Sequence, residues 1–403
     1  MTNTQNAGPG FESRVRGLLH GVAFGDAIGA PVEKLTPAEI KQMYGRVTSL
    51  DNQWHRTSRD PAAGNGRVRG NGIVTDDTLM TLSLMAVYNE VERHIDAWDM
   101  ADGMVRQIAW IKRYVPELQR ECPLLERLFY PEKWIFQRHQ LSGCDPRQGG
   151  IGNMVNCGAA MYIAPIGAIN ACDPRGAYDE AIAFASGHQQ SYGLEAAGVL
   201  AAAVAAAFVP DTTIDTVVET AHALAKDGTR EAIGAIAEAA SILRAKGADQ
   251  DEVVATFHRT IAPFSPLGDD LDHTAAKVGK ATPNYQPSRL LSIEELPLAL
   301  GFALVAFGDF RRAIEDGVNS GRDTDSIGVM AGAILGAMHG DTVIDRAEAD
   351  QIDTVNRLDL GAEAERFAQT ARTVQSADQR HFERLANQRA QLEITPGLRA
   401  AAN

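Results

Sequence analysis

The chain has 403 residues, of which 45% are hydrophobic and 22% are charged, and its formal net charge is −14. This composition is ordinary for a globular protein, and the negative charge argues against a general binder of nucleic acid or of anionic membranes. The most apolar stretches, 196–209 and 328–338, are too short to span a bilayer. No apolar core of a secretory signal follows Met1, and the four cysteines form no CxxC pair, so we expect a cytoplasmic protein.

Apolar residues recur with the 3.6-residue period of a helix along most of the chain. We predict helices at Arg14–Ala27, Thr78–Val91, Ala97–Tyr114, Tyr178–Ala185, Gly193–Phe208, Ile214–Lys226, Arg230–Lys246, Asp251–Ile261, Leu296–Phe307, Phe310–Val318 and Ser326–Gly340, with a further apolar segment at Ala160–Asn170. In Ala97–Tyr114 the expected buried stripe is Trp98, Met104, Ile108 and Ile111. Only Val68–Val74 approaches a strand pattern. The pattern therefore predicts an all-α protein.

Several of these helices are rich in Ala and Gly, which allow helix backbones to approach closely and favour a compact orthogonal multi-helix bundle. Stretches 51–72, 143–153 and 263–292 interrupt the helices but do not have the character of domain linkers. We predict a flexible N-terminus at 1–13, one catalytic domain at 14–342, a helical extension at 343–392 packed on that domain, and a flexible tail at 393–403. The extension is the expected site of any oligomer contact.

Two acidic motifs carry the chemistry, Thr75-Asp76-Asp77-Thr78 and Asp323-Thr324-Asp325-Ser326. Each precedes an apolar helix, so either could be an ordinary N-cap, although a cap needs only one such residue. If the motifs meet, their carboxylates repel one another unless cations compensate them. Carboxylate and hydroxyl oxygens are hard ligands that suit Mg²⁺ or Mn²⁺. The two motifs together indicate a metal centre within a single domain.

A third segment, 21–33, ends a predicted helix with Gly29 and Pro31 and leaves Glu33 on a loop at the helix exit. Either Glu33 serves the centre or it is an ordinary surface residue. His188 precedes the Ala-rich helix at 193–208, and a lone histidine of this kind is often only a structural hydrogen-bonder. Both alternatives stay open on the sequence.

The segments GVAFGDAIGAPVE, TDDT, CGAAMYIAPIGA and GRDTDSIGVMAGAILGAMHG occur in the order seen in the ADP-ribosylglycohydrolase family, which the chain resembles over about residues 14–342. The resemblance implies an all-helical bundle with a binuclear Mg²⁺ or Mn²⁺ centre. It matches the metal ligands to Thr75, Asp76, Asp77, Asp323, Asp325 and Ser326. Glu33 falls where some members place an acidic residue that contacts the metal or activates water. We therefore take Glu33, Asp77 and Asp325 as candidate catalytic residues.

The chain departs from the family pattern on the expected substrate side. Asn156-Cys157-Gly158 replaces a common Gly-Asn-Gly, Tyr162 follows Met161 where Arg is common, and Arg322 replaces a Gly. Segments 51–72 and 113–153 are longer than in compact members. The predicted substrate-binding residues are Asn156, Cys157, Gly158, Met161, Tyr162, His188 and Arg322. For Arg322, a structural salt bridge is the alternative.

The expected activity is hydrolysis of an N- or O-glycosidic bond at the anomeric carbon of an ADP-ribosyl or related ribosyl group. The expected substrates are ADP-ribosylated or ribosylated proteins or small molecules. One alternative is a small anionic N-riboside or nucleoside-like substrate. Another, of a different class, is a catalytically silent binding or structural relative, which titration with Mg²⁺ or Mn²⁺ would help to distinguish.

Overall fold

Two glycine-rich helices form the centre of the computed structural model, which describes residues 8–56, 66–154, 157–264 and 292–393. These are α1 (Phe11–Gly29) and α16 (Thr324–His339). A Cβ atom added at Gly21 would lie only 2.1 Å from the carbonyl oxygen of Gly332, and one added at Gly332 would lie 2.1 Å from that of Gly21. The glycine pairing runs antiparallel, so the C-terminal end of α1 lies against the first turn of α16.

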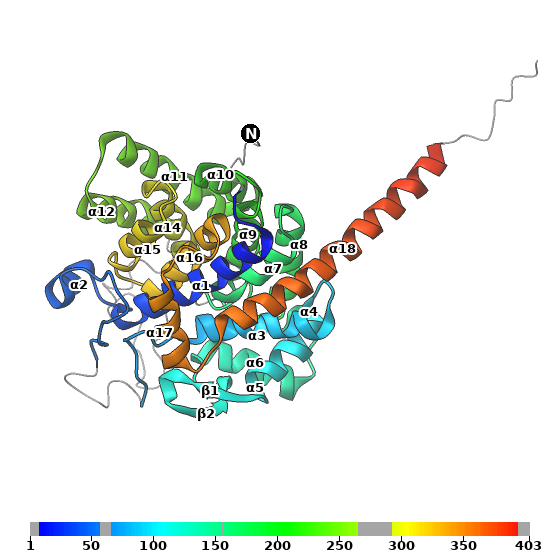
Figure 1. Cartoon of the computed structure of the whole chain (residues 1–403), viewed down its shortest axis with the longest axis horizontal. Helices are drawn as coiled ribbons and strands as arrows, with labels where there is room; N and C mark the ends of the chain where they lie inside the picture. The colour runs from blue at the N-terminus through cyan, green and yellow to red at the C-terminus, as the bar shows by residue number, and fades with distance from the viewer. Residues whose placement is uncertain (1–7, 57–65, 155–156, 265–291, 394–403) are drawn as a thin grey trace, which may run out of the picture.

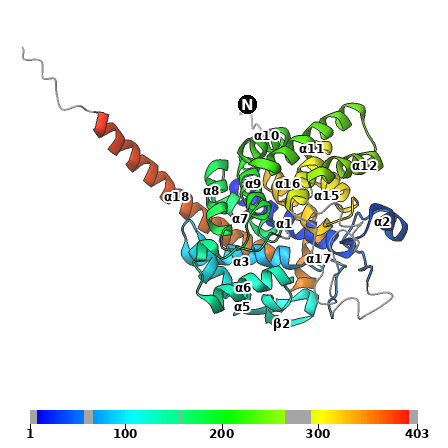
Figure 2. The same cartoon turned by 180° about the vertical axis from the view of Figure 1, so that it is seen from behind.

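The other helices surround this pair (Figures 1 and 2). They are α2 (Pro37–Tyr44), α3 (Asp76–Val91), α4 (Ala97–Asp99), α5 (Val105–Ala109), α6 (Tyr130–Ser142), α7 (Ala164–Ile169), α8 (Pro174–Ala185), α9 (Tyr192–Ala207), α10 (Ile214–Leu224), α11 (Asp227–Lys246), α12 (Gln250–Ile261), α14 (Ser292–Val305), α15 (Phe310–Val318), α17 (Arg346–Asn356) and α18 (Leu360–Glu393). Single helical turns lie at η1 (Ala30–Val32), η3 (Met100–Met104), η4 (Pro116–Leu118), η5 (Leu124–Glu126), η6 (Pro146–Gln148), η7 (Ala160–Tyr162) and η8 (Ala262–Phe264). The predicted all-α helical bundle is confirmed.

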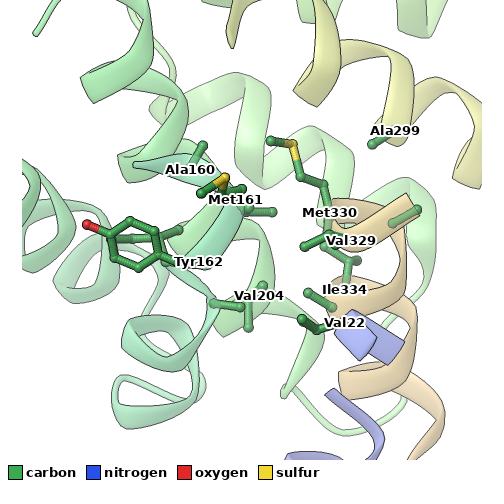
Figure 3. Packing of buried hydrophobic residues seen from close by; sticks show 14 of the residues in the cluster. Val22, Ala160, Met161, Tyr162, Val204, Ala299, Val329, Met330 and Ile334 are labelled. Atoms are coloured by element: carbon green, nitrogen blue, oxygen red, sulfur yellow. The ribbon is translucent and has the colours of Figure 1, made fainter. Parts of the chain in front are cut away.

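The hydrophobic core is one continuous cluster that includes residues from nearly all of these helices. Figure 3 shows part of it, in which Val22 of α1, Val204 of α9 and Ile334 of α16 are fully buried. Small residues allow this dense packing, because Gly167 of α7 leaves no room for a side chain beside Val204. Close helix packing through small residues, as predicted, therefore occurs between α7 and α9 as well as between α1 and α16.

The predicted helix Ala97–Tyr114 is wrong in its second half. Helix α5 ends at Ala109, and Lys112–Val115 is strand β1, paired antiparallel with β2 (Arg120–Pro123). Pro116 disfavours the helical conformation at the residue before it, which helps to explain the break. Within the predicted buried stripe, Met104 and Ile108 are buried, but Trp98 is 52% exposed and Ile111 is 37% exposed.

Three other local predictions need correction. Val68–Val74 is not a strand, because Gly70, Asn71 and Gly72 have positive φ angles and the segment makes only isolated bridges, at Gly70. Helices α2 and α6 were not predicted. Helix α2 does carry a start signal, since Thr36 and Glu39 form a capping box and Pro37 occupies the first turn.

The C-terminal extension contains α17 and the 34-residue helix α18. The first part of α18 packs against α1, α3 and α7, and its far end projects from the bundle (Figure 1). Buried residues on its inner face run from Leu360 to Val374, whereas nearly every described side chain beyond Asp378 is exposed. In the part of the chain that the structure describes, no helix is both long and apolar enough to cross a membrane.

Candidate metal centre

The first acidic motif is held in place by a buried aspartate of α1. Asp26 accepts hydrogen bonds from the backbone N–H groups of Thr75 (2.8 Å) and Thr78 (3.1 Å) and from the Thr78 hydroxyl (2.5 Å). These contacts satisfy backbone N–H groups at the N-terminus of α3. Such groups lack a hydrogen-bond partner within the helix, because no helical turn precedes them. Burial raises the pKa of Asp26 to about 6, although these hydrogen bonds oppose the shift. Asp26 therefore fixes the start of α3 against α1.

The loop before this motif is held by the C-terminal extension. Asn356 of α17 accepts a hydrogen bond from the Val74 N–H (3.0 Å) and donates one to the carbonyl oxygen of Gly72 (2.7 Å). The Asn356 side chain is fully buried. Residues far along the chain thus help to position the first acidic motif.

The two acidic motifs meet, as they must if they act together. The hydroxyl of Ser326 on α16 donates a hydrogen bond to Asp77 Oδ1 of α3 at 3.2 Å. The Cys157 thiol lies 3.2 Å from the same hydroxyl and 3.8 Å from Asp323 Oδ2. Thr324 donates a hydrogen bond to the carbonyl oxygen of Gly29, which ties the start of α16 to the end of α1.

The loop that carries Glu33 is held beside the second motif by main-chain bonds. The Lys34 N–H donates to the carbonyl oxygen of Arg322 (2.8 Å), and the Arg322 N–H donates to that of Leu35 (3.2 Å). Gly321 has φ of +75°, and a Cβ there would lie 2.4 Å from the Leu35 carbonyl oxygen. Only glycine fits this approach, which brings the helix-exit loop to α16.

Ligand atoms therefore converge at the ends of α1, α3 and α16. One carboxylate oxygen each from Glu33, Asp323 and Asp325 lies within 4.8 Å of the others. A second group with the same spacing joins Asp323 to Cys157 and Glu295 of α14. The first group, together with the adjacent Asp77, offers only oxygen donors, which fits Mg²⁺ or Mn²⁺ better than a thiophilic ion.

The carboxylates of the centre raise one another's pKa values. Burial and the Asp325 charge raise the pKa of Asp77 well above its usual range. Burial, Glu33 and Asp323 do the same for Asp325. Burial and Glu295 raise the pKa of Asp323 to about 8. A bound cation would relieve this conflict, because it favours the charged form of each carboxylate.

Buried arginines balance the negative charge of two carboxylates, Asp76 and Glu33. Arg127 forms an ion pair with Asp76 Oδ1, and Arg69 forms one with Glu33. Glu117 pairs with both arginines, at 2.7 Å from Arg69 Nε. Burial would raise the pKa of Glu33, but Lys34 and Arg69 outweigh it and hold that pKa below its usual range.

Among the predicted substrate residues, Tyr162 and His188 are fully buried against each other. The Tyr162 hydroxyl lies 2.7 Å from His188 Nδ1, and the two rings stack. Burial lowers the pKa of His188 to about 3, so the ring is neutral at physiological pH. This geometry matches the alternative of a structural hydrogen-bonder, and substrate contact by either side chain stays an untested prediction.

The remaining predicted substrate residues have different positions. Arg322 is only 2% exposed and pairs with Glu294 of α14 at 2.9 Å, which is the geometry of the salt-bridge alternative. Cys157 and Met161 are buried, Cys157 beside Asp323 and Met161 on η7 near Met330 of α16 (Figure 3). Gly158, also buried, follows Cys157 in the chain, and Asn156 lies outside the described residues.

The sequence interpretation missed five charged residues of the centre: Asp26, Arg69, Glu117, Arg127 and Glu295. Asp26 lies inside the segment 21–33, and a buried acid within an apolar helix was a readable signal. Arg69, Glu117 and Arg127 lie in the two segments identified as long, with no periodicity to indicate that they are buried. Glu295 lies in the first turn of α14, where an acidic residue is ordinarily only a helix-end charge.

The fold and the site together define a class of protein. It is an all-helical bundle with a buried acidic centre at the ends of α1, α3 and α16. The family model for ADP-ribosylglycohydrolase matches residues 7–380, and the chain belongs to this family. This confirms the resemblance carried by the sequence motifs.

The chain is also similar to individual proteins. The chain is 27% identical over 359 residues to the uncharacterized protein YegU of Escherichia coli K12, covering 88% of this chain and 96% of that one. It is 41% identical over 78 residues to an ADP-ribosyl-dinitrogen reductase glycohydrolase of Rhodospirillum rubrum, covering 19% and 22% of the two chains. A solved ADP-ribosylglycohydrolase-related protein complex shares the fold, with a TM-score of 0.51, 21% identity, and coverage of 90% of this chain and 99% of that chain.

Proposed function

We propose that this protein is a metal-dependent glycohydrolase that cleaves the bond to the anomeric carbon of an ADP-ribosyl group. The observation that carries the proposal is the meeting of the two acidic motifs, in which Ser326 of α16 bonds Asp77 of α3. Family membership supports a glycohydrolase activity in general. The substrate, the metal and the cytoplasmic location are parts of the proposal.

The residues of the centre fit two divalent cations. Thr75, Asp76 and Asp77 would hold them from α3, and Asp323, Asp325 and Ser326 from α16. When bound, such cations act as Lewis acids that orient the ribose hydroxyls and acidify a water molecule. The oxygen donor set favours Mg²⁺ or Mn²⁺. The raised pKa values of Asp77 and of Asp325 support this role, because a bound cation would favour the charged form of each carboxylate.

Glu33 is the candidate general base. It is 18% exposed, lies on the loop after η1, and has carboxylate neighbours on one side and Arg69 on the other. Lys34 and Arg69 keep it ionised, as proton acceptance requires, but the same ion pairs reduce its basicity. The remaining carboxylates contribute negative charge that stabilises an oxocarbenium-like ribosyl group.

The two alternatives have less support. A small anionic riboside needs a cationic side chain that is free to bind it, and the guanidinium of Arg322, the predicted substrate-binding cation, pairs with buried Glu294. A catalytically silent relative would be expected to have lost acidic ligands, whereas Thr75, Asp76, Asp77, Asp323, Asp325 and Ser326 are all present. ADP-ribosyl transfer to water is therefore the leading proposal.

The test is to incubate the protein, with and without Mn²⁺ or Mg²⁺, with ADP-ribosyl-arginine, ADP-ribosyl-serine and simple ribosides. We expect metal-dependent release of ADP-ribose, identified by chromatography and mass spectrometry. Asp77→Asn serves as the inactive control. Metal binding without release of sugar from any substrate would favour the silent relative, and release from ribosides alone would favour the small-substrate alternative.

A further inference from the structure

Five charges, most of them buried, form a continuous ion-pair network beside the candidate centre. Glu33 pairs with Arg69, Arg69 with Glu117, Glu117 with Arg127, and Arg127 with Asp76. The side chains of Arg69, Glu117 and Arg127 are 7%, 1% and 5% exposed. Such a network is costly to desolvate unless every member is paired, and here each charge has an opposite partner.

The middle of the network comes from outside the helices that carry the ligands. Arg69 lies in the loop between α2 and α3, Glu117 lies on η4 between the strands β1 and β2, and Arg127 follows η5. The loop and the hairpin also join through a backbone bond from the Val68 N–H to the Glu117 carbonyl oxygen (2.8 Å). Both segments are longer than the family resemblance requires.

Glu117 is the only residue of this network that touches both arginines. Burial lowers the pKa of each arginine, and the Glu117 charge raises it, first among the neighbours of Arg69 and second to Asp76 at Arg127. Each guanidinium also reaches a carboxylate of the centre. Because Arg127 uses Nε for Glu117 and Nη1 for Asp76, its orientation depends on both contacts.

We propose that Glu117 is a positioning residue that holds Arg69 and Arg127 as fixed counter-ions against Glu33 and Asp76. The inference rests on the proposed metal centre and adds a residue that touches neither the metal nor the substrate. Partners of ligating carboxylates orient them, and losing such a partner typically lowers metal affinity by about 10–100-fold. Loss of the Glu117 charge also leaves two guanidinium groups facing an incoming cation, which lowers the affinity in the same direction.

The two aspartates of the first acidic motif then differ in how their carboxylates are held. Asp76 has an arginine partner, whereas the described contacts of Asp77 are with Thr75 and Ser326. The adjacent residues of one helix turn thus face different neighbours. Glu117 therefore acts on the Asp76 side of this turn, through Arg127.

The experiment is a calorimetric Mn²⁺ titration of the wild-type protein and of Glu117→Gln, which removes the charge with little change of shape. We expect Mn²⁺ affinity about 10–100-fold lower in Glu117→Gln. Glu117→Asp should recover part of the loss because it restores the charge. Arg127→Lys should weaken binding as well, since lysine cannot bridge two carboxylates as the guanidinium does.

The matched control is Glu180→Gln. Glu180 is also a buried glutamate with several partners, Tyr88, His94 and Asn170, but its partner Tyr88 lies about 18 Å along α3 from Asp76. We expect this variant to lose thermal stability and keep wild-type Mn²⁺ affinity. Far-UV circular dichroism confirms that each variant is folded before titration.

Three outcomes distinguish the inference from the proposal on which it rests. If Glu117→Gln loses thermal stability but binds Mn²⁺ as tightly as the wild type, Glu117 only ties the hairpin to the bundle and the inference is wrong. If Glu117→Gln does not fold, Arg127→Lys decides, and unchanged affinity there overturns the inference. If the wild type binds no Mn²⁺ or Mg²⁺, the metal centre and the inference both fail.

Discussion

The α1–α16 contact and the acidic centre at its end are built from opposite kinds of interaction. Along the contact, glycines allow two backbones to touch, as at Gly21 and Gly332, without a charged side chain between them. At the centre, Asp325 and Glu33 bring like charges together. The first region is held by close packing, and the second is under electrostatic strain that counter-ions must relieve.

The difference explains why the centre cannot simply relax. Because the packed helices leave no room for a shift, the carboxylates at the end of α1 and the start of α16 stay close even when they repel. Near the same end of α1, Asp26 accepts a hydrogen bond from the start of α3, and Thr324 at the start of α16 donates one to α1. The rigid contact thus preorganises the acidic centre, at a cost in stability when no cation is bound.

The largest expected effect comes from breaking the rigid contact. Gly21→Ala places a Cβ atom 2.1 Å from the Gly332 carbonyl oxygen, so the helices must separate. We expect a loss of about 3 kcal/mol or more in unfolding free energy, or no folded protein. Gly361→Ala in α18 is the matched control, because its Cβ would meet nothing closer than 3.6 Å and should be neutral or slightly stabilising. Urea denaturation measures both, and equal stability would mean that the helices separate easily.

Removing a charge from the acidic centre should raise the stability of the metal-free protein, whereas breaking the rigid contact lowers it. Asp77→Asn removes one charge that burial and Asp325 disfavour, so the metal-free protein should gain stability. The same variant should lose metal binding and glycohydrolase activity. Thermal unfolding with chelator, paired with metal analysis, tests both. A destabilised metal-free variant with wild-type metal content would contradict the interpretation of this region as strained.

Glu33→Gln tests the chemistry of the centre while keeping its shape. We expect kcat to fall by about 10²–10⁴, the usual loss for a missing general base, with a smaller change in metal affinity than in Asp77→Asn. Steady-state rates and Mn²⁺ titration provide the two measurements. Near-normal turnover would transfer the proton-accepting role to another carboxylate.

Arg322 lies between the two regions and distinguishes a structural from a substrate role. It has φ of +69° and a buried side chain that pairs with Glu294, so Arg322→Gly and Arg322→Met both lose the ion pair, and Arg322→Gly relieves backbone strain but leaves a cavity. We expect Arg322→Gly to be the less stable variant by about 1 kcal/mol or more, with KM unchanged in both. A raised KM at unchanged stability would restore the prediction that Arg322 binds substrate.

The smallest effect lies far from both regions, at His94. A hydrogen bond to Glu180 raises the pKa of His94 to about 9, above the unfolded value of about 6.5. The stability that protonated His94 contributes is therefore complete below about pH 6.5 and is lost as the pH rises through 9. The melting temperature of the wild type should exceed that of His94→Gln by no more than a few degrees at pH 6, and the two should converge near pH 10. A constant difference would assign the effect to packing.

Much of the fold was predictable because it depends on local patterns. The 3.6-residue period predicted most helices, and four motifs in the family's order, the two acidic ones among them, predicted the family and the expected ligands. The predictions failed where local pattern and tertiary contact disagree. The Ala97–Tyr114 segment continues a helical pattern, yet Lys112–Val115 pairs with Arg120–Pro123 as strands, because Pro116 and the partner strand decide the conformation there.

The sequence by itself determined the helical class, the glycine spacing of α1 and α16, and the acidic residues that form the candidate metal centre. Only the tertiary structure decided that Arg69, Glu117 and Arg127 are buried beside Glu33 and Asp76. It also turned Arg322 towards Glu294 and His188 towards Tyr162. The physical reason is that helical periodicity is encoded by neighbours within a few residues, whereas the partner of a charged side chain is chosen among residues distant in the chain.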